Sequence, residues 1–80
     1  MSNEYKIYDG DVFGGNNTDN EYTIRKAVAG NWCLDITPYS GEVRTYCNFE
    51  TAKEAFDFCE KEEGGKIEFV RSENDDEQIK

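Results

Sequence analysis

Residues 21–49, EYTIRKAVAGNWCLDITPYSGEVRTYCNF, decide the fold, because apolar side chains return in them at every second position. Three segments alternate in this way, at residues 21–28, 32–37 and 43–49. A period of two is typical of strands with one buried face, and the short breaks between the segments suit hairpin turns. The sequence therefore predicts an antiparallel meander of three strands.

The two turns predict the register of this meander. Residues 29–31, Ala-Gly-Asn, suit a three-residue hairpin loop that pairs residue 28 with residue 32. Residues 38–41, Pro-Tyr-Ser-Gly, suit a four-residue turn that pairs residue 37 with residue 42, so that Ile36 lies opposite Val43 and Trp32 opposite Cys47. In this register the apolar residues share one face, and the other face carries Arg25, Asp35, Arg44 and Tyr46.

A helix is expected at about residues 51–63. Thr51 and Glu54 have the spacing of a capping box, an apolar stripe follows at helical period, and Gly64 with Gly65 can end the helix. Residues 66–71 alternate again and predict a last strand. We expect it parallel to the strand at 43–49, either beside it or one place away.

The expected fold class is α+β: a single twisted, mostly antiparallel sheet of four to five strands with one helix packed on one face, in the order β-β-β-β-α-β. Residues 1–71 form one domain, and residues 72–80 form an acidic disordered tail. A short strand at residues 4–8, continued near Val12 and Phe13, precedes the meander. The predicted core is Ile24, Val28, Trp32, Leu34, Ile36, Val43, Cys47, Phe49, Ala52, Ala55, Phe56, Cys59, Ile67 and Phe69.

The composition excludes several classes of function. The 80 residues hold 9 Lys/Arg against 18 Asp/Glu and no His, for a net charge of −9. This charge disfavours direct binding to nucleic acid or to an anionic membrane. The 3 cysteines are an odd number and form no Cys-x-x-Cys pair, which favours reduced thiols. With no signal-like start, we expect a cytoplasmic protein.

The sequence offers no set of catalytic groups. Without His it lacks the commonest general base, and Asp35 is the one acid placed in the middle of the predicted sheet. Cys33 is expected on the outer face as the most accessible thiol, with no base beside it. We therefore expect no enzyme activity, no cofactor and no metal.

The helix exterior suggests a binding function. Glu50, Glu54, Asp57 and Glu60, here called the acidic row, follow the solvent side of the predicted helix. A row of carboxylates can imitate a phosphate backbone. We therefore expect a small acidic module that acts by stoichiometric contact, as an inhibitor that blocks the basic, nucleic-acid-binding surface of a target protein. Some small acidic inhibitors of this kind are encoded by viruses, and we use this only as an analogy between classes of protein.

Two alternatives remain open. The first is an adaptor or a homo-oligomer, such as a homodimer, that uses the open sheet face with Tyr46, Arg44, Asp35 and Arg25, because Tyr and Arg are enriched in interfaces. The second is a calcium-type site in the loop between Asp9 and Glu21, which is rich in oxygen ligands. That loop lacks the glutamate at its twelfth position and the flanking helices that an EF-hand needs.

Overall fold

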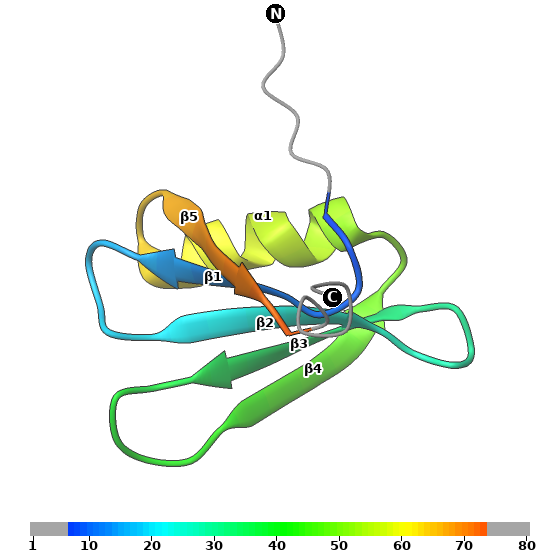
Figure 1. Cartoon of the computed structure of the whole chain (residues 1–80), viewed down its shortest axis with the longest axis horizontal. Coiled ribbons are helices and arrows are strands. Elements are labelled where there is room, and N and C mark those ends of the chain that lie inside the picture. The colour runs from blue at the N-terminus through cyan, green and yellow to red at the C-terminus, as the bar shows by residue number, and fades with distance from the viewer. Residues whose placement is uncertain (1–6, 74–80) are drawn as a thin grey trace, which may run out of the picture.

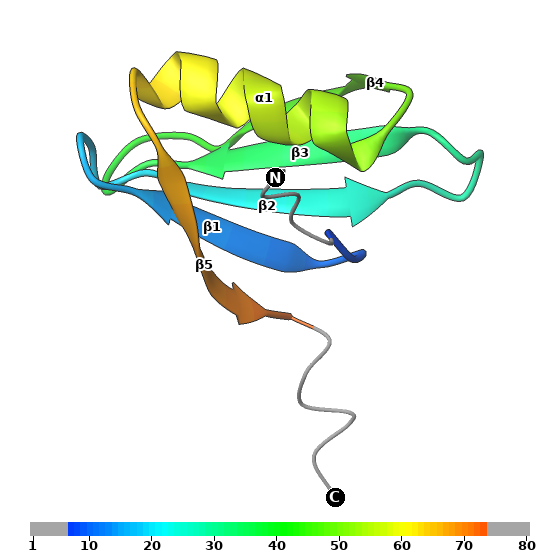
Figure 2. The same cartoon turned by 90° about the horizontal axis from the view of Figure 1, so that it is seen from above.

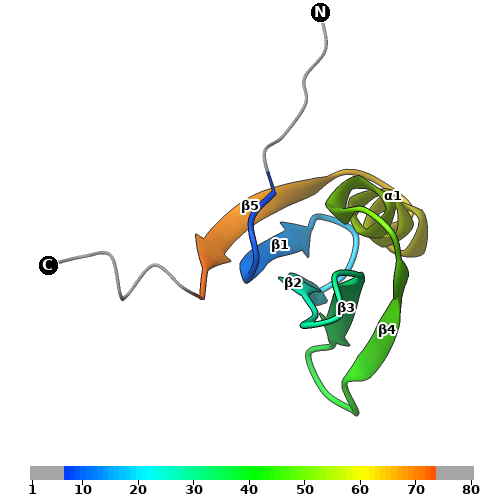
Figure 3. The same cartoon turned by 90° about the vertical axis from the view of Figure 1, so that its right-hand side faces the viewer.

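The computed structural model describes residues 7–73, which form an α+β fold (Figure 1). All neighbouring strands in its one five-stranded sheet are antiparallel, and their order is β4-β3-β2-β1-β5. The sheet is curved, and helix α1 lies against its concave side (Figure 3). This architecture confirms the predicted class and element order. The elements are β1 (Asp11–Gly15), β2 (Glu21–Lys26), β3 (Trp32–Thr37), β4 (Arg44–Phe49), α1 (Ala52–Glu63) and β5 (Ile67–Ser72).

The last strand lies at the edge opposite to the predicted one. β5 pairs with β1, placing Phe69 beside Phe13 and Ile67 beside Gly15. Because directions alternate across the sheet, β5 does run parallel to β4, but β3, β2 and β1 separate the two strands. Figure 2 shows α1 running over the sheet between these edges. β5 covers the free edge of β1, and Phe13 is then buried with its ring 5.2 Å from that of Phe56.

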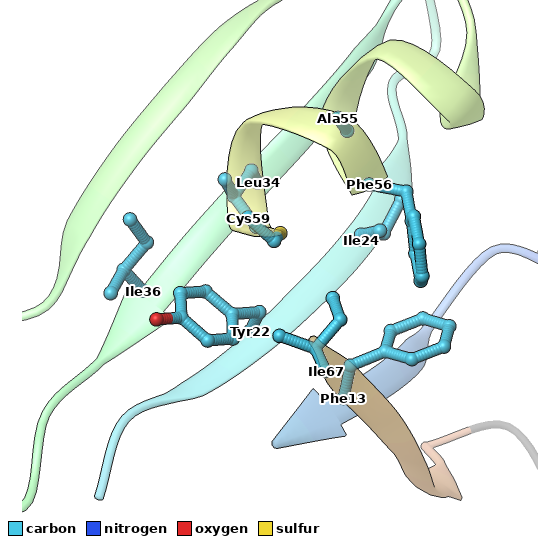
Figure 4. Packing of buried hydrophobic residues seen from close by; sticks show 9 residues of the cluster. All are labelled: Phe13, Tyr22, Ile24, Leu34, Ile36, Ala55, Phe56, Cys59 and Ile67. Atoms are coloured by element: carbon cyan, nitrogen blue, oxygen red, sulfur yellow. The ribbon is translucent and has the colours of Figure 1, made fainter. Parts of the chain in front are cut away.

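The hydrophobic core fills the space between the sheet and α1 (Figure 4). Alternate residues of the strands point toward the helix, whose buried side carries Ala55, Phe56 and Cys59. Burial of this apolar area is the main favourable contribution to folding. The cluster consists of Phe13, Tyr22, Ile24, Leu34, Ile36, Ala55, Phe56, Cys59 and Ile67. Val12 is also fully buried, on the opposite side of the sheet between Thr23 and Arg71.

The first hairpin has a longer loop than predicted. Lys26, not Val28, pairs with Trp32, and the Ala27 amide donates to the Asn31 carbonyl at 2.8 Å. Val28 was expected in the core but projects from the loop, fully exposed. Because the register moves by two residues, the side chains of β2 keep their predicted faces.

The second hairpin moves the register by one residue, which reverses the faces of β4 next to the turn. Ile36 pairs with Arg44 and Leu34 with Tyr46, so Arg44 and Tyr46 lie on the helix side of the sheet. The prediction that they belong to the open face is wrong. Val43, expected in the core, is 52% exposed. The loop between β3 and β4 is longer than predicted, so Ile36 pairs with Arg44 instead of Val43.

A register irregularity between Trp32 and Leu34 changes which face the last residues of β4 point to. Beyond it Trp32 pairs with Phe49, so Phe49 returns to the helix side as predicted. Cys33 and Cys47 lie on the other face, with their Cα atoms 4.0 Å apart, and form a disulfide. The prediction of reduced thiols is therefore wrong for this pair, and Cys47 is exposed rather than part of the core.

Phe69 was predicted in the core, and residues 72–80 were predicted to form a tail. Phe69 is 53% exposed because β5 is an edge strand, although its ring lies 5.9 Å from that of Phe13. Ser72 ends β5, and residues 74–80 of the expected tail lie outside the described residues, as do residues 4–6 of the expected first strand. Within residues 7–73 no helix has the length and apolar character needed to cross a membrane.

Candidate functional site

The start of α1 positions the first half of the acidic row. The Thr51 hydroxyl caps the helix by accepting the Glu54 amide at 3.1 Å. The Glu54 carboxylate reaches back and accepts the amide of Glu50 at 3.0 Å, one residue earlier than in a standard capping box. Glu54 therefore contributes to the helix cap as well as to the surface charge.

The rest of the row lies on the solvent side of the same helix. Asp57 is exposed and pairs with Lys53 one turn away, at 3.0 Å, and Glu60 is half-buried. Helix α1 holds five acids and two bases. An exposed pair of the Lys53–Asp57 kind contributes about 0.5 kcal/mol or less. The Lys53 ammonium therefore reduces the negative potential of the row without removing it.

The corrected register of β4 brings two of the predicted binding residues to α1. Tyr46 lies against Phe58 with ring centroids 5.0 Å apart, and Phe49 packs on the same ring at 5.5 Å. Arg44 points to the end of the helix, where its Nη2 lies 3.9 Å from a carboxylate oxygen of Glu62. We call these five residues, Arg44, Tyr46, Phe49, Phe58 and Glu62, the β4–α1 seam. The seam adjoins the acidic row because Glu54 lies one helical turn before Phe58.

The open sheet face keeps Arg25 and Asp35 but pairs them with each other. Arg25 donates from Nε and Nη2 to the two oxygens of Asp35 at 2.8 and 3.1 Å, and the Thr45 hydroxyl donates at 2.8 Å. Burial of Asp35 opposes its ionisation, but the hydrogen bonds from Arg25 and Thr45 hold its pKa below the usual value. Arg25, Asp35 and Arg44 were expected on one face, but Thr45 takes the place of Arg44 beside Asp35.

A buried carboxylate at the end of α1 was not predicted. Glu63 is 4% exposed, and its oxygens accept the amides of Asn17 and Thr18 at 2.6 and 2.7 Å, the Thr18 hydroxyl at 2.6 Å and the Tyr22 hydroxyl at 2.7 Å. Burial raises the pKa of Glu63, but these hydrogen bonds outweigh it and lower the pKa below its ordinary value. Burial and the bond to Glu63 raise the pKa of Tyr22.

Gly15 is required beside this carboxylate, since a Cβ at that position would overlap the Glu63 side chain. Two features of the sequence could have indicated the site, although neither was interpreted in that way. One is the Gly14-Gly15 pair, and the other is an acid in the last turn of a helix, where the helix dipole disfavours it. We interpret this arrangement as structural, because every oxygen of Glu63 is engaged by the chain itself.

The oxygen-rich loop does not gather its ligands at one point. Asp9 accepts the Lys26 amide at 2.9 Å, and Asp11 accepts the Tyr8 amide at 2.8 Å. At the far end, Glu21 pairs with Arg71 at 3.1 Å. Within the described residues no three His, Cys, Asp or Glu side chains come close enough to hold a metal ion.

The cysteines separate into a bonded pair and a shielded thiol. Cys33 and Cys47 tie β3 to the edge strand β4, so Cys33 is not the accessible thiol that the sequence suggested. Cys59 is fully buried in the core, and burial raises its pKa to about 12. A thiol with so high a pKa is a poor nucleophile at neutral pH.

Comparisons of the chain with protein-family models, with curated proteins and with solved structures give no match. The function is therefore argued from the surface of the molecule.

Proposed function

We propose that this protein is a small acidic binding module that occupies the basic surface of a target protein and so blocks the binding of nucleic acid there. The observation that carries the proposal is the acidic row: Glu54, Asp57 and Glu60 lie on a well-capped helix, and Glu50 directly precedes its cap. A rigid row of like charges attracts a basic surface over the range of the Debye length, and it sets the orientation of binding.

The distribution of charge supports this choice of surface. Residues 50–80 carry eleven acids and five bases, whereas residues 1–49 carry seven and four. On the open sheet face, Arg25 with Asp35 and Arg71 with Glu21 neutralise each other. Of the described residues, those at 50–73 carry eight acids and four bases in 24 positions, and those at 7–49 carry six and three in 43. The negative charge is therefore denser toward the helix, and we propose the helix side as the side that contacts the partner.

The proposal keeps the partner classes inferred from the sequence: a basic protein, with neither nucleic acid nor a membrane as a direct ligand. Action in the cytoplasm remains a prediction. The cysteines no longer support that location, because two of them pair and disulfides are rare in that compartment.

The test measures the release of labelled nucleic acid from a panel of purified DNA- and RNA-binding domains. We expect the wild-type protein to displace the nucleic acid from at least one domain, and to do so less effectively as salt is raised. The combined variant Glu50→Lys, Asp57→Lys and Glu60→Lys should lose this effect. Glu54 is left in place because it caps the helix.

The matched control reverses three exposed acids away from α1, by Glu42→Lys, Glu68→Lys and Glu73→Lys, with the same change in net charge. The control should retain most of the inhibition. Equal loss in both variants would mean that only the overall charge matters. Failure to release nucleic acid from any domain would refute the inhibitor function.

A further inference from the structure

The β4–α1 seam presents aromatic rings at an edge of the sheet. Tyr46, Phe49 and Phe58 are each only half-buried, and their rings lie 5.0 to 5.5 Å apart at tilted angles. β4 is an edge strand, so no further strand of the described chain covers this side. Half-exposed aromatic side chains of this kind are common anchors in protein interfaces.

Two cations of the protein already contact aromatic residues near this edge, one over a ring and one at a ring hydroxyl. The Lys26 ammonium lies 5.7 Å from the centre of the Trp32 ring, next to Phe49 in the sheet. The Arg44 guanidinium donates to the Tyr46 hydroxyl at 3.4 Å and approaches Glu62 at 3.9 Å. Aromatic faces and a carboxylate together form the environment that a guanidinium prefers.

These internal contacts are weak enough to be replaced. The Arg44 and Glu62 side chains are 53% and 35% exposed, and their separation of 3.9 Å is long for a charge-assisted hydrogen bond. Exposed pairs of this type contribute between zero and about 1 kcal/mol. Glu54 and Glu62 flank Phe58 by one helical turn on each side, and both carboxylates attract a cation, whereas Arg44 opposes its approach.

We infer that the β4–α1 seam binds an arginine side chain from a basic segment of the partner protein. The guanidinium lies against the rings of Tyr46 and Phe58, and Glu62 turns from Arg44 to the incoming charge. Arginine is favoured over lysine because its flat guanidinium stacks on rings and donates to a carboxylate in the same plane. The inference rests on the proposed function, because it names the group through which the basic partner is held.

The experiment titrates the full chain with an arginine-rich peptide and with a lysine-rich peptide of equal length and charge, followed by calorimetry and by amide chemical shifts. We expect the arginine peptide to bind about fivefold more tightly. The largest shifts should fall on β4 and on the turns of α1 around Phe58. Equal affinities with shifts confined to Asp57 and Glu60 would overturn the inference.

Two substitutions have opposite expected signs. Tyr46→Leu removes a ring and should weaken binding of the arginine peptide about fivefold, whereas Tyr46→Phe should keep it within about twofold. Arg44→Gln frees Glu62 and removes a competing cation, so it should strengthen binding. Weaker binding by Arg44→Gln would refute the seam as a site for cations. Thermal unfolding of each variant identifies any loss that arises from misfolding.

The outcomes separate this inference from the proposed function. Suppose that the seam variants no longer bind the arginine peptide and that the wild-type protein releases no nucleic acid from any domain. The inhibitor function is then refuted, and the seam is supported as an arginine-binding site. If reversal of the acidic row abolishes inhibition while Tyr46→Leu retains both inhibition and peptide binding, the seam fails and the inhibitor function stands. Absence of binding to either cationic peptide overturns the inference, and the release of nucleic acid alone then decides the inhibitor function.

Discussion

The loop around Glu63 and the β4–α1 seam both depend on α1, but they treat their polar groups in opposite ways. At Glu63 the carboxylate is 4% exposed and accepts four hydrogen bonds, none longer than 2.7 Å, from the loop after β1 and from β2. At the seam, Arg44 is exposed and its contact with Glu62 is 3.9 Å. The first region has its polar groups satisfied within the chain, and the second retains the capacity to exchange its partners.

This difference teaches which part of the surface is available for binding. Breaking the Glu63 site exposes several buried donors, so its effects should appear in stability. Changes at the seam remove only half-exposed contacts, so their effects should appear mainly in binding. Three predictions test this contrast, and a fourth tests the disulfide of β3 and β4, whose loss should also appear in stability.

The largest effect is expected for Glu63→Ala. The amides of Asn17 and Thr18 and the Tyr22 hydroxyl lose their acceptor, so the free energy of unfolding should fall by about 3 kcal/mol or more. Urea unfolding followed by circular dichroism measures the change. The control is Glu62→Ala, one residue earlier on the same helix, which should cost about 0.5 kcal/mol or less. Similar losses in the two variants would contradict the contrast.

Removal of the disulfide by Cys33→Ser with Cys47→Ser comes next. The bond closes a loop with a sequence separation of 14. Its loss should lower the free energy of unfolding by about 3 kcal/mol, mainly by freeing the unfolded chain. A dithiol reductant should lower the melting temperature of the wild-type protein and leave that of the double variant unchanged. Thiol counting on the unfolded, unreduced chain should find one free thiol, that of Cys59, and a count of three would refute the pairing.

Acid should weaken the Glu63 site by a smaller amount than its removal. The pKa of Glu63 is lowered by folding, so the carboxylate stabilises the native state fully above the ordinary pKa of 4.5. That stabilisation is lost as the pH falls through the lower native value. Urea unfolding across this range should show a shallower acid dependence for Glu63→Gln than for the wild-type protein. Glu62→Gln should behave like the wild-type protein.

The smallest change in stability is expected for Tyr46→Phe. It removes only the hydroxyl that accepts a 3.4 Å contact from the exposed Arg44, so the free energy of unfolding should change by about 0.5 kcal/mol or less. Thermal and urea unfolding measure this. A loss above about 1.5 kcal/mol would show that the seam is part of the structural framework.

Local sequence signals were sufficient for the elements of the fold. Thr51, Glu54 and Gly64 predicted the limits of α1, and the alternation in β2 and β3 predicted which of their residues face the helix. Turn lengths could not be predicted, because in each hairpin more than one pair of residues could form the first cross-strand pair after the loop. In the second hairpin a difference of one residue was enough to exchange the faces of Tyr46 and Thr45.

The candidate site was predicted only in part. Glu54, Asp57 and Glu60 lie on α1, as helical periodicity predicted, whereas Glu50 precedes the helix cap. Their role in binding stays a prediction. The seam and the disulfide depend on the register of β4, which one sequence does not determine. Glu63 and Thr18 are 45 residues apart, and such a contact leaves no periodic signal in the chain.

The pairing of β1 with β5 has a consequence for biosynthesis. The first and last strands of the described chain complete the sheet together, and the Glu73 amide donates to the Gly10 carbonyl at 2.9 Å. During translation β1 has no partner on this side until residues 67–72 have left the ribosome. Folding therefore completes late, and a premature stop before β5 leaves an open sheet edge that is prone to aggregation.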